Sequence, residues 1–83
     1  SYYFEKAADA AFFIKGIRMQ VSVNGQIEEI QAQSLESYLA SKLLLGRRIA
    51  IELNGAIVPK SQFSSVVLAD GDVLEIVNAI GGG

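Results

Sequence analysis

Two Asn-Gly pairs, Asn24-Gly25 and Asn54-Gly55, constrain the fold of this chain more than any other feature of its sequence. Each follows a short segment in which apolar residues alternate with others, the pattern of a strand with one buried face. Asn and Gly tolerate the positive φ angles of a type I′ turn, whose twist matches that of the flanking strands. The sequence therefore predicts two hairpins, the first from residues 19–23 and 26–30 and the second from residues 49–53 and 56–58.

One amphipathic helix is predicted between the hairpins. Ser34 can accept a backbone N–H as its N-cap, and Gly46 lies just past its expected end, where left-handed backbone is common. Apolar residues at intervals of three and four define its buried face: Leu35, Tyr38, Leu39 and Leu43. Three basic residues favour the negative end of the helix dipole and are interpreted as capping charges rather than as a site: Lys42, Arg47 and Arg48.

The remaining residues predict one more strand and complete a known order of elements. Pro59 ends the second hairpin, and in residues 60–69 the side chains of Phe63, Val66 and Leu68 are expected to pack beneath a loop or a single turn. A tight turn at residues 70–72 then leads into a last strand over residues 73–79. This order predicts an α+β protein with the β-grasp (ubiquitin-like) fold, a four- to five-stranded mixed sheet packed on one main helix. Its first and last strands should be adjacent, parallel and central.

Composition excludes several classes of function. The 83 residues fit a single domain, and 51% of them are hydrophobic, enough to bury a core. There is no Cys, which excludes disulfides and thiolate chemistry, and no His, the residue most used for proton transfer near neutral pH. No resident cofactor or metal is expected.

Charge and hydropathy indicate where the chain works. Its net charge of −2 and scattered acidic residues offer no basic face to nucleic acid. No apolar run approaches the roughly 20 residues that span a bilayer, and no signal peptide is evident. We therefore expect no nucleic-acid or membrane partner and a cytoplasmic location.

Residues 1–18 differ from the rest of the chain. They are rich in Ala and Phe, and their apolar residues recur at helical spacing, so a short amphipathic helix is one prediction. The alternative is a cloning remnant or an upstream segment outside the ancestral domain. In either case the predicted domain covers residues 19–83, with a flexible glycine tail at residues 81–83.

The glycine tail, Gly81-Gly82-Gly83, has two interpretations. A terminal glycine run is often a frayed end, because glycine loses more conformational entropy on ordering than any other residue. It can also be threaded through a channel too narrow for side chains, presenting the Gly83 carboxylate without obstruction. A carboxylate must be activated before acyl transfer, commonly with ATP, and this chain has no phosphate-binding loop. A non-catalytic carrier with a separate activating enzyme fits these constraints; a self-sufficient enzyme does not.

From Met19 onward the chain resembles the ThiS family, the sulfur carrier proteins of thiamin (thiazole) biosynthesis. Three stretches carry the resemblance: MQVSVNGQ, LNGAIVPKSQF and ADGDVLEIVNAIGGG. The family usually has Arg and Trp where this chain has Lys60 and Phe63, a difference that affects only a detail of docking.

The resemblance implies a chemical cycle on the Gly83 carboxylate. An E1-like adenylyltransferase of the ThiF type adenylates it with ATP, and a cysteine-derived persulfide replaces AMP to leave a thiocarboxylate. The thiocarboxylate then donates its sulfur to a thiazole synthase of the ThiG type. Gly81 and Gly82 are the flexible lead to the modified residue.

Partners must also bind elsewhere on the domain, and the last strand is the predicted place. If Leu74 and Ile76 face the core, then Glu75, Val77 and Ala79 lie on the open face of the sheet beside the tail. Ile80 belongs to the core-facing set of this strand, and Ile49 or Ile51 could extend the open patch. Coverage of the patch by the N-terminal extension or by neighbouring molecules is the alternative. Glu75 could steer a basic partner electrostatically, together with Asp70 and Asp72 in the preceding turn. For the two aspartates, a role as solvated turn residues is the alternative.

Three alternatives remain at this stage. The small subunit of molybdopterin synthase is also a sulfur carrier with a comparable tail. A ubiquitin-like protein modifier would instead join Gly83 to a lysine of another protein. A plain interaction module would not use the tail at all.

Overall fold

The computed structural model describes residues 18–78. Its elements follow the predicted order: β1 (Arg18–Val23), β2 (Gln26–Gln31), α1 (Leu35–Ser41), β3 (Ile49–Leu53), β4 (Ala56–Val58), a 3-10 helix η3 (Lys60–Gln62) and β5 (Val73–Asn78). The predicted helical segment at residues 1–18 lies outside the described residues except for Arg18, which begins β1.

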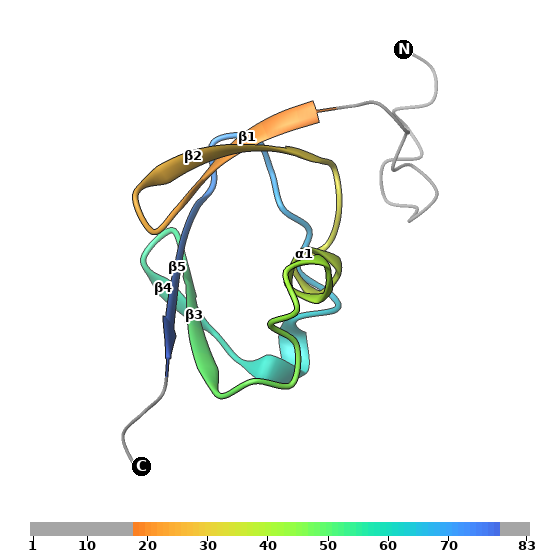
Figure 1. Ribbon diagram of the computed structural model, residues 1–83, viewed down its shortest axis with the longest axis vertical. Helices are drawn as coiled ribbons and strands as arrows, with labels where there is room; N and C mark the ends of the chain where they lie inside the picture. Colours follow the sequence, from red (N-terminus) through yellow and green to blue (C-terminus); the bar gives the residue numbers. More distant parts are fainter. Residues whose placement is uncertain (1–17, 79–83) are drawn as a thin grey trace.

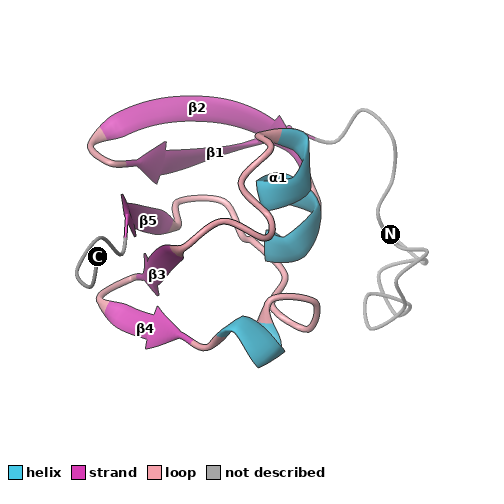
Figure 2. Ribbon diagram, turned by 60° about the horizontal axis from the view of Figure 1, so that its bottom comes forward, coloured by secondary structure: helices cyan, strands magenta, loops and turns pink. Residues whose placement is uncertain are grey.

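The five strands form one mixed sheet in the order β2-β1-β5-β3-β4. Both hairpins are antiparallel, β5 pairs with β3 antiparallel, and β1 and β5 are adjacent and parallel. Figures 1 and 2 show the curved sheet with α1 on one side of it. The predicted fold class is confirmed, including the adjacent parallel first and last strands.

The hydrophobic core lies between the sheet and α1. Its buried members come from four strands, the helix and the segment after η3: Val21, Ile30, Leu35, Tyr38, Leu39, Ile51, Phe63, Leu68 and Leu74. Val66 packs against this cluster. The prediction that residues 60–69 pack apolar side chains beneath a loop is confirmed, and η3 is the single turn within it.

Helix α1 begins as predicted, with the Ser34 hydroxyl accepting from Ser37 N–H at 3.0 Å, but it ends earlier. The last helical residue is Ser41, and Leu43 has a left-handed φ of 62° and is exposed, so its prediction as a buried helical residue is wrong. The N–H of Leu43 bonds to Ala40 O and that of Leu44 to Leu39 O, the two bonds of a Schellman motif. Leu43 therefore occupies the position at which we had expected Gly46.

Of the three basic residues near the helix end, only Lys42 holds the predicted position, as the C-cap residue of α1. The last turn of α1 contains no basic residue. Lys42 pairs with Glu28 across to β2, at 3.3 Å between Nζ and Oε1. Arg47 and Arg48 lie beyond the Schellman motif, in the connection to β3, too far along the chain to cap the helix.

Both Asn-Gly turns adopt the predicted positive φ angles, at 51° and 86° in the first and 51° and 89° in the second. Their asparagine side chains also brace β5 from both sides. Asn24 exchanges two hydrogen bonds with the backbone of Ile76, at 2.7 and 3.2 Å. Asn54 accepts from Val73 N–H at 2.8 Å. Strand β1 ends at Val23, and the side-chain amide of Asn24 therefore extends the pairing between β1 and β5 by one further position.

Replacing Tyr38 by Phe tests the link between α1 and β2. The Tyr38 hydroxyl donates to Glu28 Oε1 at 2.8 Å, and burial, with that hydrogen bond, raises the pKa of Tyr38 well above its ordinary value. Tyr38→Phe should lower the free energy of unfolding at neutral pH by about 1 kcal/mol.

The same substitution should change the pH dependence of stability. In the unfolded chain Tyr38 ionises at about pH 10. The contribution of its hydroxyl to the free energy of unfolding is therefore complete below that pH and is lost as the pH rises toward the folded pKa. Urea titrations between neutral and strongly alkaline pH should therefore give a shallower alkaline decline for Tyr38→Phe than for the wild type. An identical decline in both proteins would contradict this assignment.

Candidate partner-docking site

Strand β5 is the central strand of the sheet, and the predicted tail follows directly from it. Its last described residue, Asn78, is paired with Ile49 at the start of β3. Five of the predicted site residues lie outside the described residues: Ala79, Ile80, Gly81, Gly82 and Gly83. The structure thus defines the strand that leads to the tail, and the roles of these five residues stay predictions.

The two faces of β5 differ as the alternation predicted. Leu74 is fully buried and Ile76 packs against the core, whereas Glu75 is exposed and Val77 is 52% exposed. Val77 and Glu75 therefore lie together on the open face of the sheet.

Pairing with β3 and β4 shows which residues adjoin these two. Ala50 lies beside Val77, Glu52 lies beside Glu75, and Ile57, which is 68% exposed, follows Glu52 on β4. We call this set the open-face patch: Ala50, Glu52, Ile57, Glu75 and Val77. The suggestion that Ile49 or Ile51 extends the patch is wrong, because Ile51 is fully buried and Ile49 packs against the core. The two isoleucines share the parity of the core-facing residues on β3.

The open-face patch carries two carboxylates side by side. Glu52 and Glu75 are directly opposed across β3 and β5. Among residues 18–78 the single ion pair is Lys42–Glu28, so neither glutamate is neutralised there. Like charges in directly opposed positions cost stability. A partner that presents a cation to this patch would relieve that repulsion.

The two turn aspartates have structural partners. Asp70 Oδ1 accepts from Gln20 N–H at 2.7 Å. Asp72 accepts from Asn54 Nδ2 at 3.0 Å and from Ala69 N–H at 2.8 Å. These bonds fix the turn before β5, which favours the turn role over electrostatic steering.

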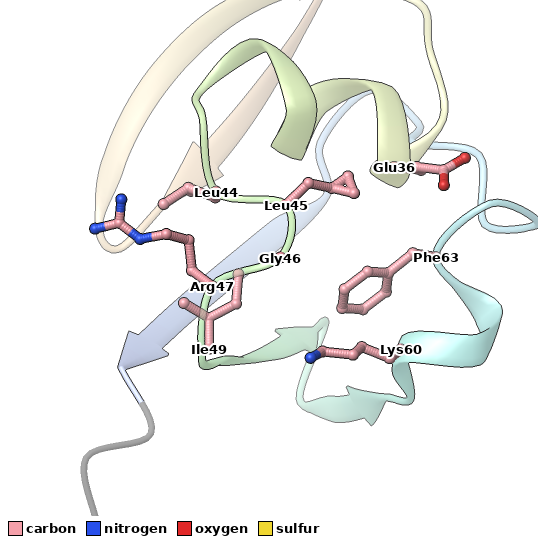
Figure 3. A pocket seen from close by; sticks show the side chains of 8 residues that line it. All are labelled: Glu36, Leu44, Leu45, Gly46, Arg47, Ile49, Lys60 and Phe63. Carbon is pink, nitrogen blue, oxygen red and sulfur yellow. The ribbon is translucent and has the colours of Figure 1, made fainter. Parts of the chain in front are cut away.

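Sequence reasoning missed a pocket of about 180 Å³ at the end of the sheet where β3 begins. Apolar side chains form much of its wall: Leu44, Leu45, Ile49 and Phe63. Gly46 and three charged residues complete its lining: Glu36, Arg47 and Lys60 (Figure 3). The residues come from three separated segments, so no local pattern marks them. Ile49 belongs to the pocket and pairs with Asn78, which places the pocket next to the end of β5.

No residues within 18–78 are grouped to hold a metal ion through His, Cys, Asp or Glu. In the same range, no helix has the length and apolar character needed to cross a membrane.

A five-stranded mixed sheet with parallel first and last strands around one helix defines a ubiquitin-like β-grasp protein. Residues 14–83 match the model of the ThiS family. The chain therefore belongs to the ThiS family. The crystal structure of a thiamine biosynthesis protein (ThiS) from Geobacter metallireducens is similar, with a TM-score of 0.69 and 26% identity over 78% of this chain and all of that one.

Relatives of known sequence fall into two size classes. The chain is 41% identical over 66 residues to a thiazole synthase of Paramagnetospirillum magneticum, a match that covers 78% of this chain but spans 20% of that protein. It is 38% identical over 50 residues to the sulfur carrier protein ThiS of Bacillus subtilis, covering 60% of this chain and 76% of that one. It is also 33% identical to the uncharacterized protein ycf40 of Pyropia yezoensis, covering 93% of that protein.

Proposed function

We propose that the protein is a sulfur carrier of thiamin biosynthesis whose working group is the Gly83 carboxylate. The carboxylate attacks the α-phosphate of ATP on a ThiF-type adenylyltransferase, forming the acyl adenylate and releasing pyrophosphate. The terminal sulfur of a cysteine-derived persulfide displaces AMP, and thiol cleavage of the resulting S–S bond leaves the thiocarboxylate. The thiocarboxylate then gives its sulfur to a ThiG-type thiazole synthase. The observation that carries the proposal is the family match, which extends through the glycine tail.

The thiazole synthase partner has its own support. A segment similar to this chain forms a fifth of a protein named thiazole synthase, so a carrier-like domain and that activity occur in one polypeptide. The match to a sulfur carrier protein ThiS supports the thiamin branch over molybdopterin synthesis in the same way.

A carrier role requires no catalysis by this chain. It has no Cys or His with which to form a thioester or transfer a proton near neutral pH. Its own contribution is to present the tail from a braced strand and to bind its partners. ATP is consumed by the activating enzyme, and no cofactor resides on the carrier.

Intact-mass spectrometry tests the proposal. The chain is incubated with ATP, a ThiF-type enzyme, a cysteine desulfurase and cysteine, and each reagent is omitted in turn as a control. We expect a mass increase equal to the replacement of one oxygen by sulfur, lost again when thiazole synthase and its substrates are added. The absence of this species from every complete reaction would refute the proposal.

Glu75→Lys tests the open-face patch as the docking site for the activating enzyme. Placing a cation opposite Glu52 removes the repulsion and should raise the free energy of unfolding by about 0.5 kcal/mol. It should also slow association with a partner that presents a cation, most strongly at low salt. Adenylation rates measured across a salt series report this association.

Glu29→Lys is the matched control. Glu29 is an exposed acid on the same face of the sheet, but it lies on β2, at the far edge from β3 and β4. The Glu29→Lys substitution should leave the adenylation rate close to that of the wild type. Equal slowing by both substitutions would indicate a general effect of net charge and would count against a docking role for Glu75.

A further inference from the structure

The pocket beside the end of β5 has the size and lining of a binding site for one apolar side chain. A cavity of about 150 Å³ lined by aliphatic and aromatic groups accommodates a benzene ring, and this pocket measures about 180 Å³. In Figure 3 the side chains of Leu44 and Ile49 lie on one side of it and that of Phe63 on the other. One aliphatic side chain would fit between these two walls.

The charges in the lining favour a neutral occupant. Figure 3 shows the guanidinium of Arg47 turned away from Lys60 and Phe63. The remaining charged side chains of the lining are Lys60 and Glu36, one cation and one anion, and their formal charges cancel. A charged side chain would therefore lose its hydration in the pocket without a matching gain. An aliphatic side chain would instead be stabilised by burial of its apolar surface.

The tail of the chain supplies such a side chain. Its last five residues contain one large apolar residue, Ile80. Asn78 is paired with Ile49, which lines the pocket, and two residues beyond Asn78 span at most about 7 Å. Ile80 also shares the alternation of Leu74, which faces the core, and the pocket lies on that side of the sheet because Ile49 packs against the core.

We propose that Ile80 binds in this pocket and anchors the tail to the domain, so that the free part of the tail is residues 81–83. The free reach of the Gly83 carboxylate is then that of three residues, about 10 Å, instead of five, about 17 Å. A channel too narrow for side chains stops at Ile80, so the anchor stays bound while the glycines enter an enzyme. This last step rests on the proposed function; binding of Ile80 in the pocket does not.

Nuclear magnetic resonance of the isotopically labelled 83-residue chain tests the anchor without any enzyme. We expect through-space contacts between the methyl protons of Ile80 and the side-chain protons of Ile49 and Phe63. Relaxation measurements should show the Ile80 amide nearly as ordered as the amides of β5, with order lost over residues 81–83. The inference is overturned if these contacts are missing and order is already lost at Ile80.

Leu45→Ser tests whether the pocket is the binding site. Leu45 lines the pocket and is 38% exposed, so its replacement removes an apolar wall with little loss of core packing. The contacts of Ile80 should disappear, and its amide should become as disordered as the glycine amides. Leu43→Ser is the matched control, since Leu43 lies in the same loop, is 78% exposed and does not line the pocket. Retained contacts in Leu45→Ser, or equal losses in both variants, would count against the pocket.

Adenylation kinetics test the anchor during loading. Ile80→Ser releases the tail without shortening it, and the released residues must be ordered again on the ThiF-type enzyme. The KM for the chain should therefore rise by about tenfold with little change in kcat, and Ile80→Val should restore most of the loss. Leu45→Ser should raise KM similarly, and the double substitution no further, because both changes remove one contact.

An unchanged KM in Ile80→Ser, or additive effects of the two substitutions, would overturn a role of the anchor in loading. Failure of the carrier function gives a different result. In that case the wild-type chain never forms the adenylate or the thiocarboxylate, while the contacts of Ile80 seen by nuclear magnetic resonance persist.

Discussion

Removal of Gly82 and Gly83 is expected to abolish thiocarboxylate formation and to leave the unfolding midpoint nearly unchanged. The shortened chain still ends in a glycine carboxylate, so its intrinsic chemistry is preserved. Its reach, however, falls by about 7 Å. Misplacement of a reacting group by about 1 Å can already cost a hundredfold in rate, so the carboxylate should not reach the site of adenylation. Intact-mass spectrometry and thermal unfolding measure the two effects.

Gly83→Ala is the matched control for that truncation. It keeps the length and the terminal carboxylate and adds only a methyl group beside the reacting carbon. We expect slower modification than in the wild type but a detectable thiocarboxylate. Normal modification of the truncated chain would show that the reach of the tail is unimportant. A large fall in its unfolding midpoint would show that the tail belongs to the packed structure.

The hairpins and the faces of the strands were predictable because they depend on local chemistry. An Asn-Gly pair fixes its turn with two residues, and strict alternation then determines which side chains face the core. Leu74 and Val77 could therefore be placed on opposite faces of β5 from the sequence alone, and the structure shows that Leu74 is the buried one.

The end of the helix could not be predicted from the same local rules. Leucine has a high helix propensity, and residues 43–45 continue the apolar pattern, so the sequence favours a longer helix. In the structure the chain turns at Leu43, and Leu44 and Ile49 pack against the core. Tertiary packing of these two residues prevails over the local preference.

The surfaces beside the tail depend on contacts between distant segments. The opposition of Glu52 and Glu75 follows from the register of β3 against β5, which no turn determines. The pocket joins residues of α1, the loop before β3 and η3. Lys60 and Phe63 could be singled out through the family resemblance, but only the fold shows that they line the same pocket as Leu45.

Leu74→Ala is expected to have the largest effect on stability. Leu74 is fully buried at the centre of the sheet and the core, so its truncation should cost about 3 kcal/mol. Small domains are often stabilised by only about 5 kcal/mol in total, so the variant should unfold at a much lower urea concentration. Val77→Ala, on the open face of the same strand, should change stability by less than about 0.5 kcal/mol. Equal losses in the two variants would mean that Val77 is also packed, and the open-face patch would then be unavailable to a partner.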